Sequence, residues 1–104
     1  MMFKSKFHPG IIDGSVTRTY RYWKRPQGVA GNFYKVNPIG HIRVTSAKTV
    51  SPTKISTAHA KSSGFESRKE LLDYLDQFKS ADNELYCVEF VYEAGALTRN
   101  LING

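Results

Sequence analysis

The chain has 104 residues, a formal net charge of +6 and one cysteine. This length corresponds to a single domain, which buries about two thirds of the surface of its unfolded chain. No apolar run reaches the roughly 18 residues of a membrane helix, and a lone cysteine forms no internal disulfide. We therefore expect a cytoplasmic domain without a membrane anchor. The three histidines lie far apart in the sequence, so we expect neither a metal nor a cofactor.

Positive charge is concentrated in the first two thirds of the chain. Residues 1–64 hold eleven Lys and Arg against one acid and carry +10, whereas residues 65–104 hold four against eight acids and carry −4. A basic region interleaved with aromatic residues is typical of surfaces that meet phosphates and stack bases. Two alternatives are a basic surface that only faces water and a protein-interaction domain that uses the acidic part.

The N-terminal residues predict a strand followed by a helical turn. Residues 2–7 alternate, with Phe3 and Phe7 on one face and lysines on the other, which favours a short strand. Pro9 and Gly10 end this strand, and residues 11–13 form one helical turn that Gly14 stops.

The next segment, residues 14–25, is rich in Thr, Tyr, Val and Trp and predicts a strand. Because side chains alternate along a strand, one face carries Thr17, Thr19, Arg21 and Trp23, and the other carries Val16, Arg18, Tyr20 and Tyr22. An unpaired arginine is costly to bury, so Arg21 either reaches solvent at the mouth of a cavity or has an anionic partner. The alternative is an edge strand with a solvated polar face.

Two further strands are predicted in the middle of the chain. Residues 25–31 form either an ordinary hairpin connection or a mobile basic loop beside the preceding strand. A short strand is expected over 32–36 and a longer one over 40–50, the second with Ile42 and Val44 inward, His41 outward and an irregularity near Ser46.

Helix signals follow between residues 56 and 78. Ser56 caps a short helix through about Ser62, and Gly64 is a stop in the left-handed conformation. The capping-box sequence that begins at Ser67 starts a second helix. Its apolar stripe consists of Leu71, Leu72, Leu75 and Phe78.

Residues 85–92 are mostly apolar and predict a central strand. Glu89 is the exception within it. Its carboxylate either pairs with Arg21 or another cation of the 14–25 strand, or points to solvent from an edge.

The pattern Gly14-x-Val16-x-x-Thr19-x-Arg21 resembles the G-x-K-x-x-T-x-R motif of the ASCH (activating-signal-cointegrator homology) domain. The order of elements over roughly residues 3–93 is similar as well. The resemblance implies an α+β fold, a small PUA-like β-barrel with two or three short helices. We expect one ASCH-like domain over 1–104, with a tail from about residue 94 that either adds a short cover to the barrel or is loose.

Together, the basic region and the resemblance predict that RNA or a nucleotide binds in a basic cleft beside the strand from Gly14 to Arg21. In this interpretation Arg18 and Arg21 hold phosphate, and Thr17 and Thr19 form hydrogen bonds. A base stacks on Trp23 or Tyr20. Lys24 and Arg25 add non-specific attraction.

A hydrolase is the alternative prediction. Some ASCH proteins are amidohydrolases on acetylated cytidine that use the motif lysine, the motif threonine and an acid. Here Thr19 matches the threonine, but Val16 replaces the lysine and Ser63 stands near the position of the acid. Valine neither activates a hydroxyl nor moves a proton, so Arg18, His59 or Glu89 would have to substitute.

A ribonuclease is the second enzymatic alternative, and it would require His41, His59 and Arg21 to converge. We therefore expect a binding module rather than an enzyme, with Thr19 as the one catalytic candidate.

Overall fold

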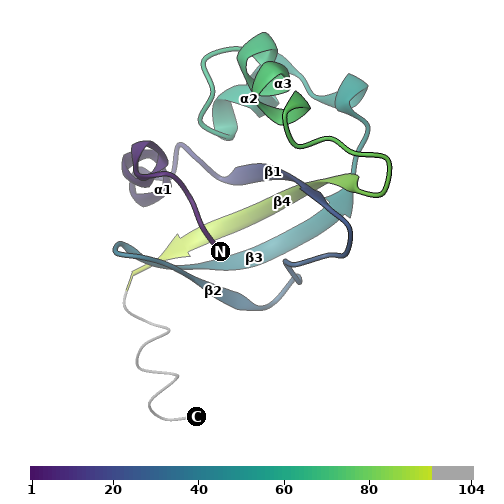
Figure 1. Ribbon diagram of the computed structural model, residues 1–104. Coiled ribbons are helices and arrows are strands. Elements are labelled where there is room, and N and C mark those ends of the chain that lie inside the picture. Colours follow the sequence, from purple (N-terminus) through teal and green to yellow (C-terminus); the bar gives the residue numbers. More distant parts are fainter. Residues whose placement is uncertain (95–104) are drawn as a thin grey trace.

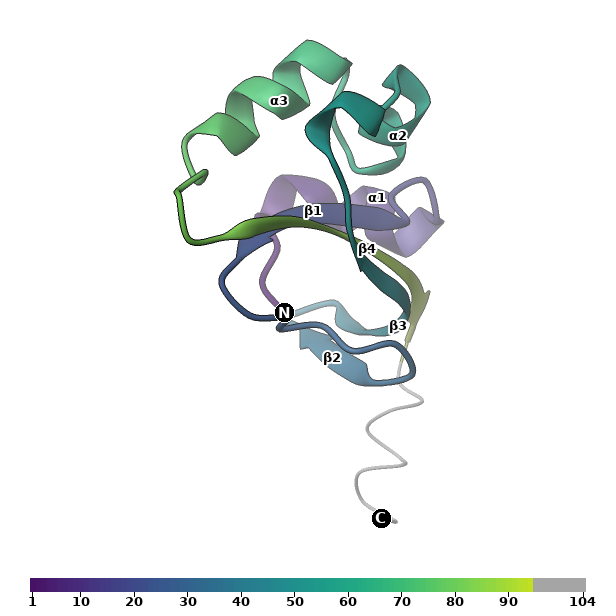
Figure 2. The ribbon, with the colours of Figure 1, turned by 90° about the vertical axis from the view of Figure 1, so that its right-hand side faces the viewer.

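The computed structural model describes residues 1–94. Four strands form one antiparallel sheet with the order β1-β4-β3-β2. They are β1 (Arg18–Trp23), β2 (Phe33–Val36), β3 (Gly40–Thr49) and β4 (Glu84–Glu93). The sheet curls into a half-barrel (Figures 1 and 2). The protein is thus an α+β domain with a barrel-like sheet, as expected.

Three short helices accompany the sheet: α1 (His8–Asp13), α2 (Thr57–Ser62) and α3 (Arg68–Asp76). Single 3₁₀ turns cover Ser5–Phe7 and Pro52–Lys54. Helices α2 and α3 lie together over one face of the sheet, beside β1 (Figure 1). The N-terminal residues run between β1 and β2 on the open side of the half-barrel (Figure 2), where the backbone nitrogen of Met1 donates to the Lys35 carbonyl at 3.0 Å.

Two apolar layers hold these elements in place. On the helix side, buried Leu71 and Leu75 of α3 pack against Tyr20 of β1 and Leu85 of β4. Inside the half-barrel, the second layer consists of two clusters of buried side chains. One comprises Ile11 of α1, Val16 of the segment before β1, and Val36, Ile42 and Phe90 of three strands. The other comprises Trp23, Val44 and Val88. Each face of β4 is therefore covered, which explains why its sequence is almost continuously apolar.

Local signals in the sequence correctly place the starts of α2 and α3 and the ends of α1 and α2. The Ser56 hydroxyl accepts from the His59 amide at 3.0 Å, and the Ser67 hydroxyl accepts from the Glu70 amide at 3.1 Å. Gly14 and Gly64 end their segments with φ of 85° and 93°, in the left-handed region that glycine adopts without steric cost. The irregularity in β3 lies between Val44 and Ser46, close to the predicted position.

The predicted strand over 2–7 is wrong. No residue of this segment pairs with a strand, and Ser5–Phe7 forms a 3₁₀ turn that leads into α1. Pro9 stands in the first turn of α1, where its missing N–H is not needed, so it starts this helix rather than ending a strand. The alternating Phe and Lys residues reflect a segment with one buried side.

The hairpin prediction for residues 25–31 is also wrong. β1 and β2 lie at opposite edges of the sheet, so this loop crosses from one edge to the other. His41 is 2% exposed rather than outward-facing, and its ring lies 5.6 Å from that of Phe33. Phe78 follows the end of α3 instead of belonging to it.

The expected loose tail, apart from Ala94, lies outside the described residues. Within residues 1–94, none of the helices has the length and apolar character needed to cross a membrane.

Candidate functional site

A pocket of about 420 Å³ opens along the free edge of β1. The N-terminal residues form one wall and α3 the other. Eight of its lining residues are aromatic: Phe3, Phe7, Tyr20, Tyr22, Trp23, Phe65, Tyr74 and Phe78. Because β1 is an edge strand, side chains from both of its faces reach the pocket. Its size lies in the range of small-molecule sites, and its walls offer several ring faces.

Arg21 supplies a cation in the wall of this pocket. Its Nε donates to the Thr19 hydroxyl at 3.0 Å, and its Nη2 donates to the Met2 carbonyl at 2.5 Å. The guanidinium carbon lies 4.9 Å from the centre of the Phe3 ring. Within residues 1–94, no carboxylate lies within ion-pair distance of Arg21. The pocket therefore contains a positive charge that is positioned but not neutralised.

Burial lowers the pKa of Arg21, which means that the protein environment does not compensate fully for the water that its guanidinium has lost. Arginine nevertheless keeps its charge at physiological pH. A partly desolvated cation without an acid partner is an energetically favourable place for an anionic group of a ligand.

Lys4 is the other cation in the pocket wall. Its ammonium lies 5.1 Å from the centre of the Tyr74 ring. Two cations thus stand on the N-terminal segment and β1, across from the aromatic side chains of α3.

The two aliphatic hydroxyl groups that line the pocket already have partners. Thr19 accepts from Arg21, and Ser63 donates to the Ala60 carbonyl at 2.8 Å. The described residues that line the pocket include neither a carboxylate nor a histidine. A hydrolytic mechanism needs a group that accepts a proton from the nucleophile, and the walls formed by residues 1–94 do not supply a conventional one.

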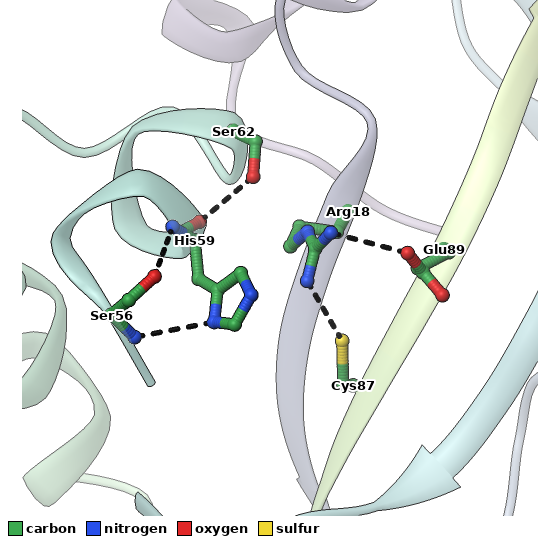
Figure 3. A network of polar contacts seen from close by, with 6 residues as sticks. All are labelled: Arg18, Ser56, His59, Ser62, Cys87 and Glu89. Carbon is green, nitrogen blue, oxygen red and sulfur yellow. Dashed lines mark hydrogen bonds and ion pairs between the residues drawn. The ribbon is translucent and has the colours of Figure 1, made fainter. Parts of the chain in front are cut away.

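Arg18 lies outside the pocket and belongs to a separate polar cluster, shown in Figure 3. Its Nη2 lies 3.1 Å from Oε1 of Glu89, and its Nη1 lies 3.9 Å from Sγ of Cys87. The acid in the middle of β4 therefore pairs with a cation of the 14–25 strand. The partner is Arg18 and not Arg21, and Glu89 does not lie on an edge strand, because β4 is internal to the sheet.

Burial raises the pKa of the Cys87 thiol and, next to it, that of Tyr20. Burial therefore favours the neutral forms of both groups, although the positively charged Arg18 guanidinium lies close to them. On α2, His59 accepts at Nδ1 from the Ser56 amide at 3.2 Å and so completes the helix cap (Figure 3). Its role in the described structure is to hold the start of α2.

The structure brings three of the seven predicted binding residues together, namely Thr19, Arg21 and Trp23. The remaining four, Thr17, Arg18, Lys24 and Arg25, do not line the pocket. Lys24 forms an exposed ion pair with Asp82 at 3.0 Å, and the Thr17 amide donates to the Ser62 carbonyl at 2.9 Å. Val16 is buried and lies in the inner apolar layer.

Sequence reasoning missed the residues that face β1 across the pocket. The sequence pattern predicts a strand for Phe3 and Lys4, includes Phe78 in the apolar stripe of a helix and indicates no role for Tyr74. The detectable signal in the sequence was the position of Phe78 at the end of the apolar stripe. A large aromatic residue at such a position extends beyond the surface that the helix buries, and in the structure Phe78 is 48% exposed.

The histidines do not converge at the pocket. His41 lies buried on β3 and His59 caps α2, and neither lines the pocket with Arg21. Among residues 1–94, no group of three His, Cys, Asp or Glu side chains is arranged to hold a metal ion.

Comparison with known proteins shows a shared fold. No protein-family model matches the sequence, and no curated protein matches it. Among solved structures, the chain is similar to a protein from Enterococcus faecalis V583 assigned to the family model DUF984. The TM-score is 0.59 at 19% identity, and the match covers 83% of this chain and 69% of that one. At this identity the likeness extends to the fold alone.

Proposed function

We propose that this protein binds RNA or a nucleotide in the pocket beside β1. In this proposal a phosphate group contacts Arg21, and a base lies against the aromatic wall that includes Trp23. Lys4, at the mouth of the pocket, adds attraction for the same anion. The protein acts as a binding module in the cytoplasm and does not change its ligand chemically.

The observation that carries the proposal is the state of Arg21. Its guanidinium is partly desolvated, is fixed by two hydrogen bonds and lies in a pocket wall without a carboxylate partner among the described residues. A ligand that supplies an anionic oxygen provides the missing charge, and the fork of the guanidinium suits phosphate. The ring faces around it suit a flat base.

The composition of the chain supports the same ligand class. Residues 1–64, which include the N-terminal segment and β1 of the pocket, carry +10. Such a region attracts polyanions at a distance, in a salt-dependent way.

The resemblance of the Gly14–Arg21 segment to the ASCH motif is part of the proposal. The α+β half-barrel is compatible with a PUA-like barrel of that family, and Thr19 and Arg21 of the motif line the pocket. Val16, at the place of the motif lysine, does not line it. We therefore propose binding rather than hydrolysis of acetylated cytidine or RNA.

The test is a titration of the protein with adenosine monophosphate and with a single-stranded oligoadenylate at two salt concentrations. Arg21→Gln keeps much of the side chain's length and removes its charge. Hydrogen bonds to charged groups contribute about 1.5 to 3 kcal/mol, so we expect this variant to lose about tenfold to a hundredfold in affinity. Arg25→Gln is the matched control, because Arg25 is exposed and does not line the pocket.

Two results would overturn the proposal. One is the absence of detectable affinity for either probe at low salt. The other is an affinity that depends equally on Arg21 and Arg25, since that would indicate diffuse attraction rather than a pocket. Circular dichroism of both variants confirms that the fold is retained.

A further inference from the structure

A second hollow of about 360 Å³ adjoins the β1 pocket. Phe7 and Phe65 line both hollows, and the centres of their rings lie 5.6 Å apart. This pair of rings is therefore the wall between the two spaces. A ligand long enough to occupy both hollows would have to cross these two rings.

The second hollow contains two lysines. The Lys6 ammonium lies 5.1 Å from the centre of the Phe7 ring and 5.8 Å from that of Phe65, directly over the dividing wall. Lys61 of α2 reaches the hollow from the other side. Neither lysine forms an ion pair with a carboxylate of residues 1–94.

One acid, Glu66, also lines this hollow. The nearby Asp13 carboxylate accepts from the Ser15 amide at 2.8 Å, so it is engaged by the turn after α1. Two cations against one lining acid leave the second hollow with a positive balance, as in the β1 pocket, where Arg21 and Lys4 stand without a lining acid among the described residues.

We infer that the two hollows are consecutive subsites for single-stranded RNA. The β1 pocket takes one nucleotide, with its phosphate at Arg21. The phosphodiester of the next nucleotide lies over the Phe7–Phe65 wall, where Lys6 and Lys61 contact it. This inference rests on the proposed function and adds that the preferred ligand is a polynucleotide rather than a mononucleotide.

The distribution of chemistry between the hollows supports this order. Ring faces suit a base, and they are concentrated in the β1 pocket. Flexible ammonium groups act as point charges that suit a phosphate without requiring a fixed orientation. Besides Lys4 in the β1 pocket, two of them, Lys6 and Lys61, line the second hollow. A mononucleotide would leave both lysines without an anionic partner.

The experiment compares adenosine monophosphate with the dinucleotide pApA, which carries one additional phosphate. We expect pApA to bind more tightly, with a salt slope of log K that is steeper by roughly 0.7 for the additional phosphate contact. The double variant Lys6→Ala with Lys61→Ala should remove this gain and leave the affinity for the monophosphate within twofold. Lys48→Ala with Lys54→Ala removes the same charge from lysines that line neither hollow and should preserve the gain.

Equal binding of both probes by the wild-type protein would overturn the inference, and so would a double variant that weakens both probes to the same degree. In either case the proposed function stands, provided that Arg21→Gln still weakens monophosphate binding by about tenfold or more. If neither probe binds at low salt, the proposed function itself fails. Because the four lysines are exposed, we expect all these variants to fold.

Discussion

Arg18 of β1 and Glu89 of β4 stand opposite each other in the sheet and form an ion pair, with 3.1 Å between Nη2 and Oε1. The Arg18 side chain is only 20% exposed, whereas that of Glu89 is 44% exposed. Loss of the ion pair should therefore be more unfavourable for Arg18 than for Glu89, because the arginine has lost more of its hydration.

We predict that Glu89→Gln lowers the free energy of unfolding by about 1 kcal/mol, since it leaves the Arg18 guanidinium without a counter-charge. The estimate includes a reduction for the solvent around Glu89. Urea denaturation measures the change. Asp73→Asn is the control, because it removes an exposed ion pair with Lys69 and should have a smaller effect. An equal loss in both variants would contradict the assigned role of Arg18.

Removing a buried side chain of α3 should have a larger effect. Leu75 is 3% exposed and packs in the layer between α3 and the sheet, so Leu75→Ala should cost about 2 to 5 kcal/mol. Leu72 is only partly buried at the border of the same layer, and Leu72→Ala should cost less. Urea denaturation measures the loss of stability in both variants, as a shift of the midpoint at an unchanged m-value. A larger loss for Leu72→Ala than for Leu75→Ala would show that α3 is rotated relative to the sheet.

Gly14 and Gly64 provide a matched pair of substitutions. Both have φ near +90°, so alanine at either position costs about 1 to 2 kcal/mol in backbone strain. A Cβ at Gly14 would meet no atom within 4 Å, whereas one at Gly64 would lie 2.5 Å from the Phe7 ring. We therefore predict that Gly64→Ala is clearly more destabilising in thermal unfolding. It should also weaken ligand binding, because Phe7 lines both hollows.

Stability should decrease at alkaline pH. Burial raises the folded-state pKa of Cys87 above its ordinary value of 9.0 and that of Tyr20 above 10.0. The folded protein therefore holds these protons more tightly than the unfolded chain, and the associated stability is complete below pH 9 and is lost as the pH rises through the folded values. Cys87→Ala should make the free energy of unfolding decline less between pH 9 and 10 than in the wild type. An unchanged pH profile in this variant would contradict the assignment.

Binding should be visible in the intrinsic fluorescence of the protein. Trp23 is the single tryptophan of the chain, and it lines the β1 pocket. A base that stacks in the pocket changes the surroundings of the indole, so titration with adenosine monophosphate should quench or shift the emission with a saturable curve. Arg21→Gln should shift this curve to higher ligand concentration. A signal that does not saturate would indicate no defined site.

Local features of the fold were predictable because their causes are local. Ser56 and Ser67 have side chains that can cap a helix, and Gly14 and Gly64 tolerate a positive φ, so these boundaries depend on a few consecutive residues. The central position of β4 followed from its apolar sequence. The α+β class could be predicted from these helices and strands alone.

The errors concern positions that depend on distant partners. The alternation of Phe3 and Phe7 with lysines fits a strand, but residues 2–7 pair with neither edge strand, so no ladder forms. Nothing within residues 25–31 indicates that the following strand lies at the opposite edge of the sheet. In the candidate site, Arg21, Thr19 and Trp23 were identifiable from the motif strand. The opposite wall was not, because Tyr74 and Phe78 reach the pocket only through the packing of α3.

The edge position of β1 has a consequence for how variation along this strand should be interpreted. Thr19, Tyr20, Arg21, Tyr22 and Trp23 all border the same cavity, although neighbours in a strand ordinarily serve opposite environments. A substitution scan across these five positions should thus reveal an unbroken run of ligand-sensitive sites instead of every second one. In a related sequence, the same cavity would be indicated by little variation at consecutive positions of this strand.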